Sequence, residues 1–361
     1  MGEHEQRSAN MGVTFNTWLE KFQERVVESK WTKLFVLAST LQLCSVIVLE
    51  SRVLDRNNRF RKTLMDSGNT TCTKPSIDRM LLIEQENAIF MVFQLFQLWF
   101  CLNAVYNQNT FQIITIAVIN FLCGLCSIVQ ILEIRKWSSD LNAACGAVVP
   151  NFDKDFGSYD VPLVVCLVIF SLIIAFLSWK LYQQFGWNIY KRIGADIRMQ
   201  KIYKTILIFV LYLKLDLFFI LVTAVEVFMS FNIDTPQTNN FIFVLPKGLY
   251  YFHMFVTIMI LLLEVLAYYA LRREWKIGMI VYLVLSLCTV VDFIVLLKFA
   301  TKTITQSWYF FILLVVVAIV LSLLTWVWAL LVTRDFDKGF ANLIEEGIKK
   351  KETRKPIIIE D

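Results

Sequence analysis

The feature that most constrains this chain is a series of long stretches without a charged side chain. The longest covers residues 87–132, where 46 consecutive residues carry no charge. A transmembrane helix needs about 20 mostly apolar residues, so this stretch is long enough for two helices. The composition is 57% hydrophobic and 18% charged, whereas soluble chains average about 45–50% and about 25%. The sequence therefore predicts an all-α, polytopic transmembrane helix bundle and excludes an ordinary soluble enzyme.

Eight spans are predicted from the apolar runs and from the polar residues that separate them. The polar stretch 106–112 divides the longest run, because amide-rich segments favour turns. Pro162 is placed in the first turn of the fourth span, where its missing N–H costs no helical hydrogen bond. The expected spans cover residues 34–49, 88–106, 111–132, 162–182, 204–230, 248–271, 276–298 and 308–332. Together they predict one membrane bundle over residues 34–333, whose longest connection is residues 50–87.

The segments outside the bundle are predicted to form short amphipathic helices at the membrane surface. Within residues 1–33, an apolar stripe lies opposite charged residues at helical spacing. Residues 334–361 repeat this pattern and add a basic run from Lys349 to Lys355. Such a run attracts anionic lipid headgroups by about 1 kcal/mol per cation. The alternative is that the stripes pack on the bundle and the basic run only fixes the topology.

The distribution of basic residues predicts that both termini lie in the cytosol. In that orientation 21 Lys and Arg residues are cytosolic and 13 are luminal, and basic residues are retained on the cytosolic side. The sequon at Asn69 then falls in the first luminal loop, where it can be glycosylated. Cys72 and Cys145, the two cysteines outside the spans, also become luminal. Since the lumen is oxidising, they are predicted to form a disulfide.

Ionisable residues inside three spans are the sharpest functional signal. The predicted spans 204–230, 248–271 and 276–298 contain Lys214, Asp216, Glu226, His253, Glu264 and Asp292. Each costs at least about 2.5 kcal/mol at depth, so such groups normally face one another or a wet cavity. Counting from the helix ends puts Glu226, His253 and Asp292 in an outer tier and the other three deeper, with Glu264 as the expected partner of Lys214. The cluster is either a proton or cation pathway or a set of structural ion pairs.

Other residue types exclude several kinds of protein. Two histidines, His4 and His253, are too few for a histidine-rich metal centre. The Cys123–Cys126 pair lies inside a span, where the thiolate that redox or metal chemistry needs is disfavoured. A net charge of +5 is too small and dispersed for a nucleic-acid surface. We therefore expect no cofactor, no metal, no nucleic-acid partner and, because no nucleophile and base pair is evident, no enzymatic activity.

Residues 186–220 carry a resemblance to a known family. This basic, aromatic-bearing connection runs directly into the fifth span and contains Trp187, Tyr190, Lys191, Gly194, Ala195, Asp196, Lys214 and Asp216. It resembles the corresponding stretch of a fungal family of multi-pass Golgi apparatus membrane proteins of unassigned function. The resemblance implies a Golgi membrane location and no particular activity. The expected role is scaffolding or trafficking support, and the alternative is a proton- or cation-coupled transporter that uses the intramembrane charges.

The topology is testable through the sequon. Endoglycosidase treatment should increase the gel mobility of the wild-type protein and leave that of Asn69→Gln unchanged, because the sequon is expected in the lumen. A glycan attached to a sequon engineered near residue 10 would contradict the eight-span topology and favour seven spans with a luminal N-terminus.

Overall fold

Eight long helices make up most of the structure. The computed structural model describes residue 20 and residues 23–66, 70–145, 152–193, 197–232, 246–302 and 309–336. The helices are α2 (Lys30–Asp66), α3 (Thr70–Asn107), α4 (Thr110–Cys145), α5 (Phe152–Ile193), α6 (Ile197–Asn232), α7 (Lys247–Arg273), α8 (Lys276–Lys302) and α9 (Tyr309–Asp335). All eight are long and apolar enough to cross a membrane, and the described residues contain no strand. The predicted all-α, polytopic fold is confirmed.

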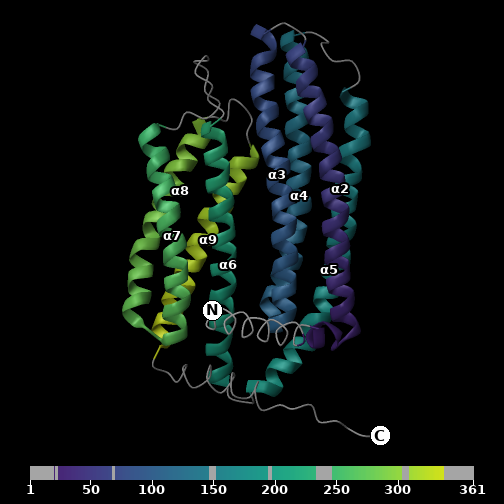
Figure 1. The fold of residues 1–361 in the computed structure, drawn as a ribbon. Helices are drawn as coiled ribbons and strands as arrows, with labels where there is room; N and C mark the ends of the chain where they lie inside the picture. Colours follow the sequence, from purple (N-terminus) through teal and green to yellow (C-terminus); the bar gives the residue numbers. More distant parts are fainter. Residues whose placement is uncertain are drawn as a thin grey trace, which may run out of the picture. The chain divides into compact units, whose positions relative to one another are not determined.

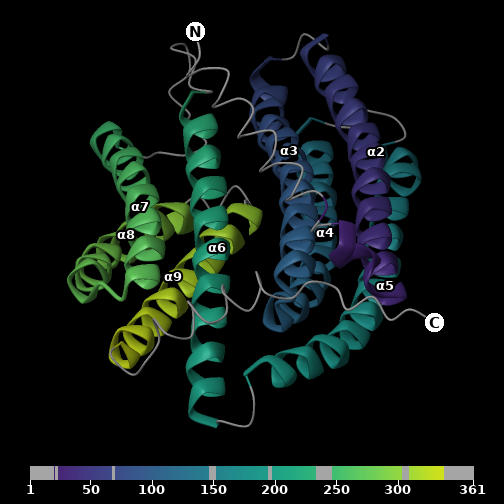
Figure 2. The same ribbon diagram turned by 60° about the horizontal axis from the view of Figure 1, so that its bottom comes forward.

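The helices form two compact units rather than one. Residues Met1–Gly194 form the first bundle and Ala195–Asp361 form the second bundle. In the first bundle, α2 and α4 each pack against both α3 and α5; in the second, α6 and α8 each pack against both α7 and α9 (Figures 1 and 2). Helices joined by short connections pack as neighbours, and four of them close a core. The bundle predicted over residues 34–333 is thus divided into two four-helix rings of the same order.

The helices of the first bundle extend beyond their apolar runs. With 37 residues, α2 is about 55 Å long at about 1.5 Å per residue, whereas the hydrocarbon core of a bilayer is about 30 Å thick. The connection predicted over residues 50–87 is wrong, because α2 continues to Asp66 and α3 begins at Thr70. Two interleaved seven-residue series continue the core-facing stripe of α2 through this charged segment: Val46, Val53, Phe60 and Glu50, Asn57, Leu64. That spacing is typical of packed helices.

A separate apolar cluster stabilises this extension. Leu64 from α2, Met80 and Ile83 from α3, and Ile134 and Trp137 from α4 are all buried in it. The ring of Trp137 meets that of Phe60 edge to face, with the ring centroids 5.6 Å apart. Two ion pairs also join the helices here, Arg61 with Glu84 at 2.9 Å and Arg79 with Glu133 at 3.8 Å. The extension is therefore a packed continuation of the bundle.

Pro162 lies inside α5 rather than in its first turn. The helix begins at Phe152, ten residues before the proline. Since proline has no N–H, α5 lacks one helical hydrogen bond at this point. The prediction placed the helix start at the beginning of the apolar run, but α5, like α2, continues into its charged segment.

The predicted turn within 106–112 is confirmed. Helix α3 ends at Asn107, and Asn109 Oδ1 caps α4 by accepting hydrogen bonds from the N–H groups of Phe111 and Gln112.

Aromatic and basic residues meet at one end of α2 and α5. The Lys180 ammonium lies 4.8 Å from the ring centroid of Trp179, 5.6 Å from that of Trp31 and 5.8 Å from that of Phe176. Trp and Lys favour the boundary between hydrocarbon and headgroups. This group therefore marks a membrane surface.

The amphipathic helices predicted at the two ends of the chain are described only in part. Residues 23–27 are helical, as predicted for the N-terminal segment, whereas residues 1–19 and the tail after residue 336 lie outside the described residues.

The packing of the extension predicts a large effect for Trp137→Ala. Removing a buried aromatic side chain lowers the free energy of unfolding by about 3–5 kcal/mol, so the thermal unfolding midpoint of the purified protein should fall by several degrees. Lys136→Ala, at the exposed neighbouring position on the same helix, is the control and should change it little. Equal changes of the unfolding midpoint in Trp137→Ala and Lys136→Ala would contradict close packing of the helices in this extension of the first bundle.

Candidate functional site

A buried histidine and aspartate join two helices of the second bundle. His253 of α7 and Asp292 of α8 are each 1% exposed, and 2.5 Å separates His253 Nδ1 from Asp292 Oδ2. The other polar atoms of the pair, His253 Nε2 and Asp292 Oδ1, have no hydrogen-bond partner among the described residues. The predicted outer tier therefore contains a direct α7–α8 contact.

Two acidic side chains lie close together deeper in the same bundle. Asp216 of α6 and Glu264 of α7 are 3% and 4% exposed and near enough to interact electrostatically. Ser322 of α9 donates a hydrogen bond of 2.7 Å to Asp216 Oδ1. Tyr282 of α8 faces the Glu264 carboxylate, but neither Glu264 oxygen accepts a bond of normal hydrogen-bond geometry. All four helices of the bundle thus contribute a polar side chain at this level.

The remaining predicted residues lie on α6. Glu226 is 1% exposed, and neither carboxylate oxygen has a hydrogen-bond partner among the described residues. Lys214 is half-buried. Neither Glu264 oxygen has a hydrogen-bond partner among the described residues, so the expected bond from Lys214 is not formed, and the charged neighbour of Glu264 is Asp216. The prediction failed because depth along a helix was known from the sequence, but the rotation of each helix was not.

Hydroxyl side chains occupy the levels between the two acidic tiers. On α6, Thr223 lies between Asp216 and Glu226, which are ten residues and hence about 15 Å apart along the axis. Thr257 on α7 and Ser286 and Thr289 on α8 occupy the corresponding intervals on their helices, and all four are buried. The Thr289 hydroxyl has no hydrogen-bond partner among the described residues. We call the two tiers and these hydroxyls the polar column. On α8 the polar groups of these levels lie three or four residues apart, at Tyr282, Ser286, Thr289 and Asp292.

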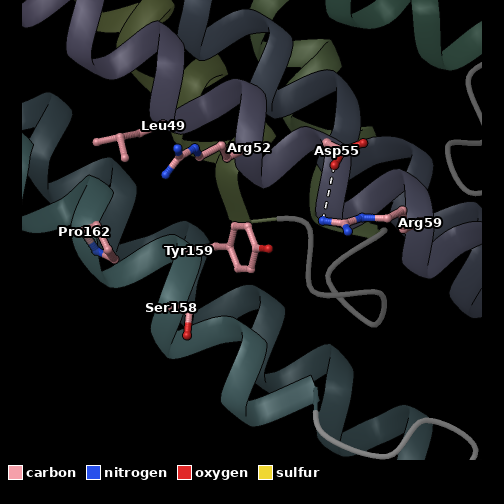
Figure 3. Close-up of a pocket in the computed structure, with 7 residues that line it drawn as sticks. All are labelled: Leu49, Arg52, Asp55, Arg59, Ser158, Tyr159 and Pro162. Atoms are coloured by element: carbon pink, nitrogen blue, oxygen red, sulfur yellow. Dashed lines mark ion pairs between the residues drawn. The ribbon is translucent and has the colours of Figure 1, made fainter.

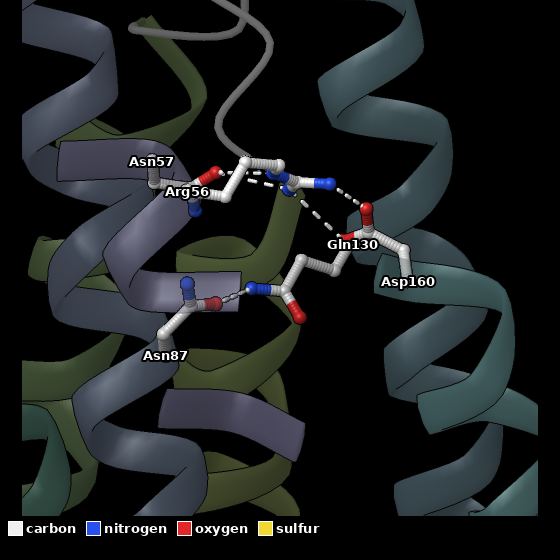
Figure 4. A network of polar contacts seen from close by, with 5 residues as sticks. All are labelled: Arg56, Asn57, Asn87, Gln130 and Asp160. Atoms are coloured by element: carbon white, nitrogen blue, oxygen red, sulfur yellow. Dashed lines mark hydrogen bonds and ion pairs between the residues drawn. The ribbon is translucent and has the colours of Figure 1, made fainter. Parts of the chain in front are cut away.

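The first bundle contains a buried ion pair that the sequence reasoning missed. Arg56 of α2 is bidentate to Asp160 of α5, with Nη1 bonding Oδ2 and Nη2 bonding Oδ1 at 3.2 Å (Figure 4). Asn57 Oδ1 accepts bonds from Nε and Nη2 of the same guanidinium, at 3.2 and 2.9 Å. The two charged side chains are only 5% and 6% exposed. Arg56 was missed because residues 50–87 were taken for a loop, although the seven-residue spacing that places Asn57 in the core could have revealed the helix.

Amide side chains link the first three helices of the same bundle. Gln42 of α2 exchanges two bonds with Asn120 of α4, at 2.8 and 3.0 Å, and donates to Gln94 of α3 at 3.2 Å. Gln130 of α4 bonds Asn87 of α3 (Figure 4). Each interhelical hydrogen bond of this kind contributes about 0.6–2 kcal/mol in a membrane. These amide side chains therefore connect α2, α3 and α4 across their interfaces.

One acidic side chain of the first bundle lacks such a partner. Glu50 of α2 is completely buried, and neither carboxylate oxygen has a hydrogen-bond partner among the described residues. Its charged neighbours are Asp160 and Arg56. Glu50 is therefore comparable in burial to Glu264, but it has a guanidinium in its surroundings.

The luminal features predicted from the sequence stay predictions. Asn69 lies outside the described residues, as do the side chains of Cys72 and Cys145. Cys72 is the third residue of α3 and Cys145 is the last residue of α4. Since these helices are consecutive and antiparallel, the start of α3 and the end of α4 lie at the same side of the first bundle.

In the described ranges, no group of three or more His, Cys, Asp or Glu side chains could hold a metal ion.

The fold and its buried polar cores define a multi-pass helical membrane protein. Over 161 residues the chain is 30% identical to a UPF0658 Golgi apparatus membrane protein from Schizosaccharomyces pombe. The match covers 39% of this chain and 46% of that protein, so it spans less than half of the relative's length. It confirms the resemblance to fungal Golgi membrane proteins noted in the sequence and supports a Golgi membrane location. No family model and no solved structure matches the chain.

The ion pair of the first bundle gives a double-substitution test. Arg56→Met and Asp160→Leu each leave an unpaired buried charge, which costs about 3–5 kcal/mol of stability, and the double variant should lose less than the sum. Arg59→Met, which breaks the exposed Arg59–Asp55 pair, should cost at most about 1 kcal/mol. Thermal unfolding of the purified variants measures these differences. Additive losses from the two buried substitutions would show that the residues do not act as a pair.

Proposed function

We propose that this protein is a proton-coupled transporter of the Golgi membrane, with both termini in the cytosol, and that the polar column of the second bundle takes up and releases the proton. Under this proposal the chain is a transporter and not an enzyme. The Golgi location is supported by the similarity to the Schizosaccharomyces pombe protein.

The observation that carries the proposal is the acidic pair at the deeper tier. Asp216 and Glu264 are buried and close together, and in the described part of the chain the polar groups beside them are the hydroxyls of Ser322 and Tyr282. Two neighbouring carboxylates in a low-dielectric core do not both ionise, because their repulsion adds to the cost of desolvation. A proton on either carboxyl group removes that repulsion. A site that holds one exchangeable proton within the bilayer is the element that proton coupling needs.

The outer tier supplies a second place for a proton. The hydrogen bond between His253 Nδ1 and Asp292 Oδ2 contains one, and Glu226 lies on the neighbouring helix α6. The hydroxyls of Thr257, Ser286 and Thr289 lie between the tiers. The Thr257 and Ser286 hydroxyls donate to backbone carbonyl groups of their own helices, so they must turn toward their neighbours in the column to pass a proton. The arrangement therefore supports exchange of a proton between the two tiers when bound water completes the chain.

A scaffolding or trafficking-support role is the second candidate. The first bundle favours this role, because interhelical amide hydrogen bonds and the Arg56–Asp160 ion pair stabilise one arrangement of its helices. In that role the polar column would only hold α6 to α9 in register. The two candidates differ in whether protons cross the membrane.

Proton flux into vesicles distinguishes the candidates. The purified protein is reconstituted with a trapped pH-sensitive dye, and a pH gradient is imposed with Na⁺, K⁺, Ca²⁺ or Mn²⁺ on the opposite side in turn. Wild-type vesicles should take up protons with at least one of these cations, and Glu264→Gln should reduce the rate at least tenfold. The amide keeps the shape of the side chain but cannot exchange the proton.

Glu50→Gln is the matched control, because Glu50 is equally buried but belongs to the first bundle. It should retain most of the flux. Wild-type flux no faster than that of protein-free vesicles under every gradient would reject proton exchange against these cations and favour the support role. Equal losses in Glu50→Gln and Glu264→Gln would show that the acidic pair has no special part.

A further inference from the structure

A pocket of about 390 Å³ opens between α2 and α5 of the first bundle (Figure 3). Leu49, Arg52, Asp55 and Arg59 line it from α2, and Ser158, Tyr159 and Pro162 line it from α5. The α2 residues are three or four positions apart, so they share one face of the helix. The pocket is distinct from the polar column, which belongs to the other bundle.

The pocket lies where the apolar parts of two neighbouring helices end. Leu49 is the last residue of the apolar run of α2, directly before Glu50, and the apolar run of α5 starts after Asp160, next to Pro162. The opposite ends of these runs are marked by Trp31 and Lys180, which contact each other. Trp31 and Leu49 are 18 residues apart, as are Pro162 and Lys180, and this separation corresponds to about 27 Å of helix. A hydrocarbon core is about 30 Å thick, so the pocket lies at the level of the lipid headgroups.

The pocket carries a net positive charge. Arg59 is neutralised by Asp55, with Nη2 and Oδ2 3.2 Å apart, and Arg56 behind the pocket is neutralised by Asp160. Arg52 makes no hydrogen bond or ion pair with any residue in the described part of the chain. One positive charge is thus left at the mouth, together with the hydroxyl groups of Ser158 and Tyr159. Guanidinium and hydroxyl groups are the donors that bind phosphate oxygens.

The apolar side of the pocket continues into lipid-facing helix surface. Val48 on α2 and Val165 and Leu172 on α5 are 56%, 50% and 68% exposed. Acyl chains of a lipid whose phosphate meets Arg52 would run along this surface. A soluble phosphate would gain nothing from it.

From this placement we propose that the pocket between α2 and α5 binds the phosphodiester group of an anionic membrane phospholipid, with Arg52 as its principal ligand. The single excess positive charge matches the single negative charge of a phosphodiester. The Tyr159 hydroxyl is a further donor for the phosphate oxygens, and Leu49 and Pro162 contact the start of the acyl chains. This site is separate from the basic run at residues 349–355.

Lipid titration of the full-length protein in detergent, followed by native mass spectrometry, tests the site. Phosphatidylglycerol is the anionic phosphodiester probe and phosphatidylcholine is the neutral one. Wild-type protein should bind phosphatidylglycerol more tightly than phosphatidylcholine. Arg52→Gln should weaken phosphatidylglycerol binding about tenfold, or about 1.4 kcal/mol, and Arg52→Lys, which keeps the charge, should lose less.

Arg135→Gln is the matched control, since it removes an exposed arginine from α4 of the same bundle, outside the pocket. It should bind phosphatidylglycerol like the wild type. Equal binding by Arg52→Gln and Arg135→Gln would overturn the proposal, as would equal binding of the two lipids by the wild type. Millimolar inorganic phosphate should not compete; if it displaces phosphatidylglycerol, the pocket serves a soluble phosphate and the lipid assignment is wrong.

Discussion

The structure depends on one constraint: inside a bilayer, a polar group must find its partner within the protein, because no water is present to supply it. The helices satisfy this for the backbone. Side chains must satisfy it by meeting across helix interfaces, and the two bundles do so to different degrees. In the first, Gln42, Asn120 and Gln94 bond one another, and Arg56 and Asp160 neutralise each other. These contacts hold its four helices in register.

The second bundle leaves more of its buried acidic groups without such partners. His253 and Asp292 are paired, but Glu226 has no hydrogen-bond partner among the described residues and Glu264 lies beside a second acid. Partly satisfied polar networks are costly in a low-dielectric core. A protein retains them at a cost to stability where the groups serve a function. These acidic groups, Glu226 and the Asp216–Glu264 neighbours, are the physical reason for proposing transport through the second bundle.

The sequence predicted the eight spans because apolar runs of bilayer length have few other folds available. It did not predict the helical extension of α2, since Arg52, Asp55, Arg56 and Arg59 make the segment look like a solvated loop. Only the seven-residue spacing of Val53 and Phe60 indicated a packed helix. Pairing between helices was harder to predict. The depths of Lys214 and Glu264 agreed, yet Asp216 is the charged neighbour of Glu264, because helix rotation depends on packing that no single span encodes.

Proton coupling, as proposed, requires that Asp216 or Glu264 carry an exchangeable proton within the membrane. Infrared difference spectroscopy of the reconstituted protein detects protonated carboxyl groups directly, through a carbonyl band that ionised carboxylates lack. At neutral pH we expect a band that is lost in Glu264→Gln and that persists, less any signal from Glu50 itself, in Glu50→Gln. A spectrum in which Glu264→Gln removes no protonated-carboxyl band would show that this acidic pair holds no proton.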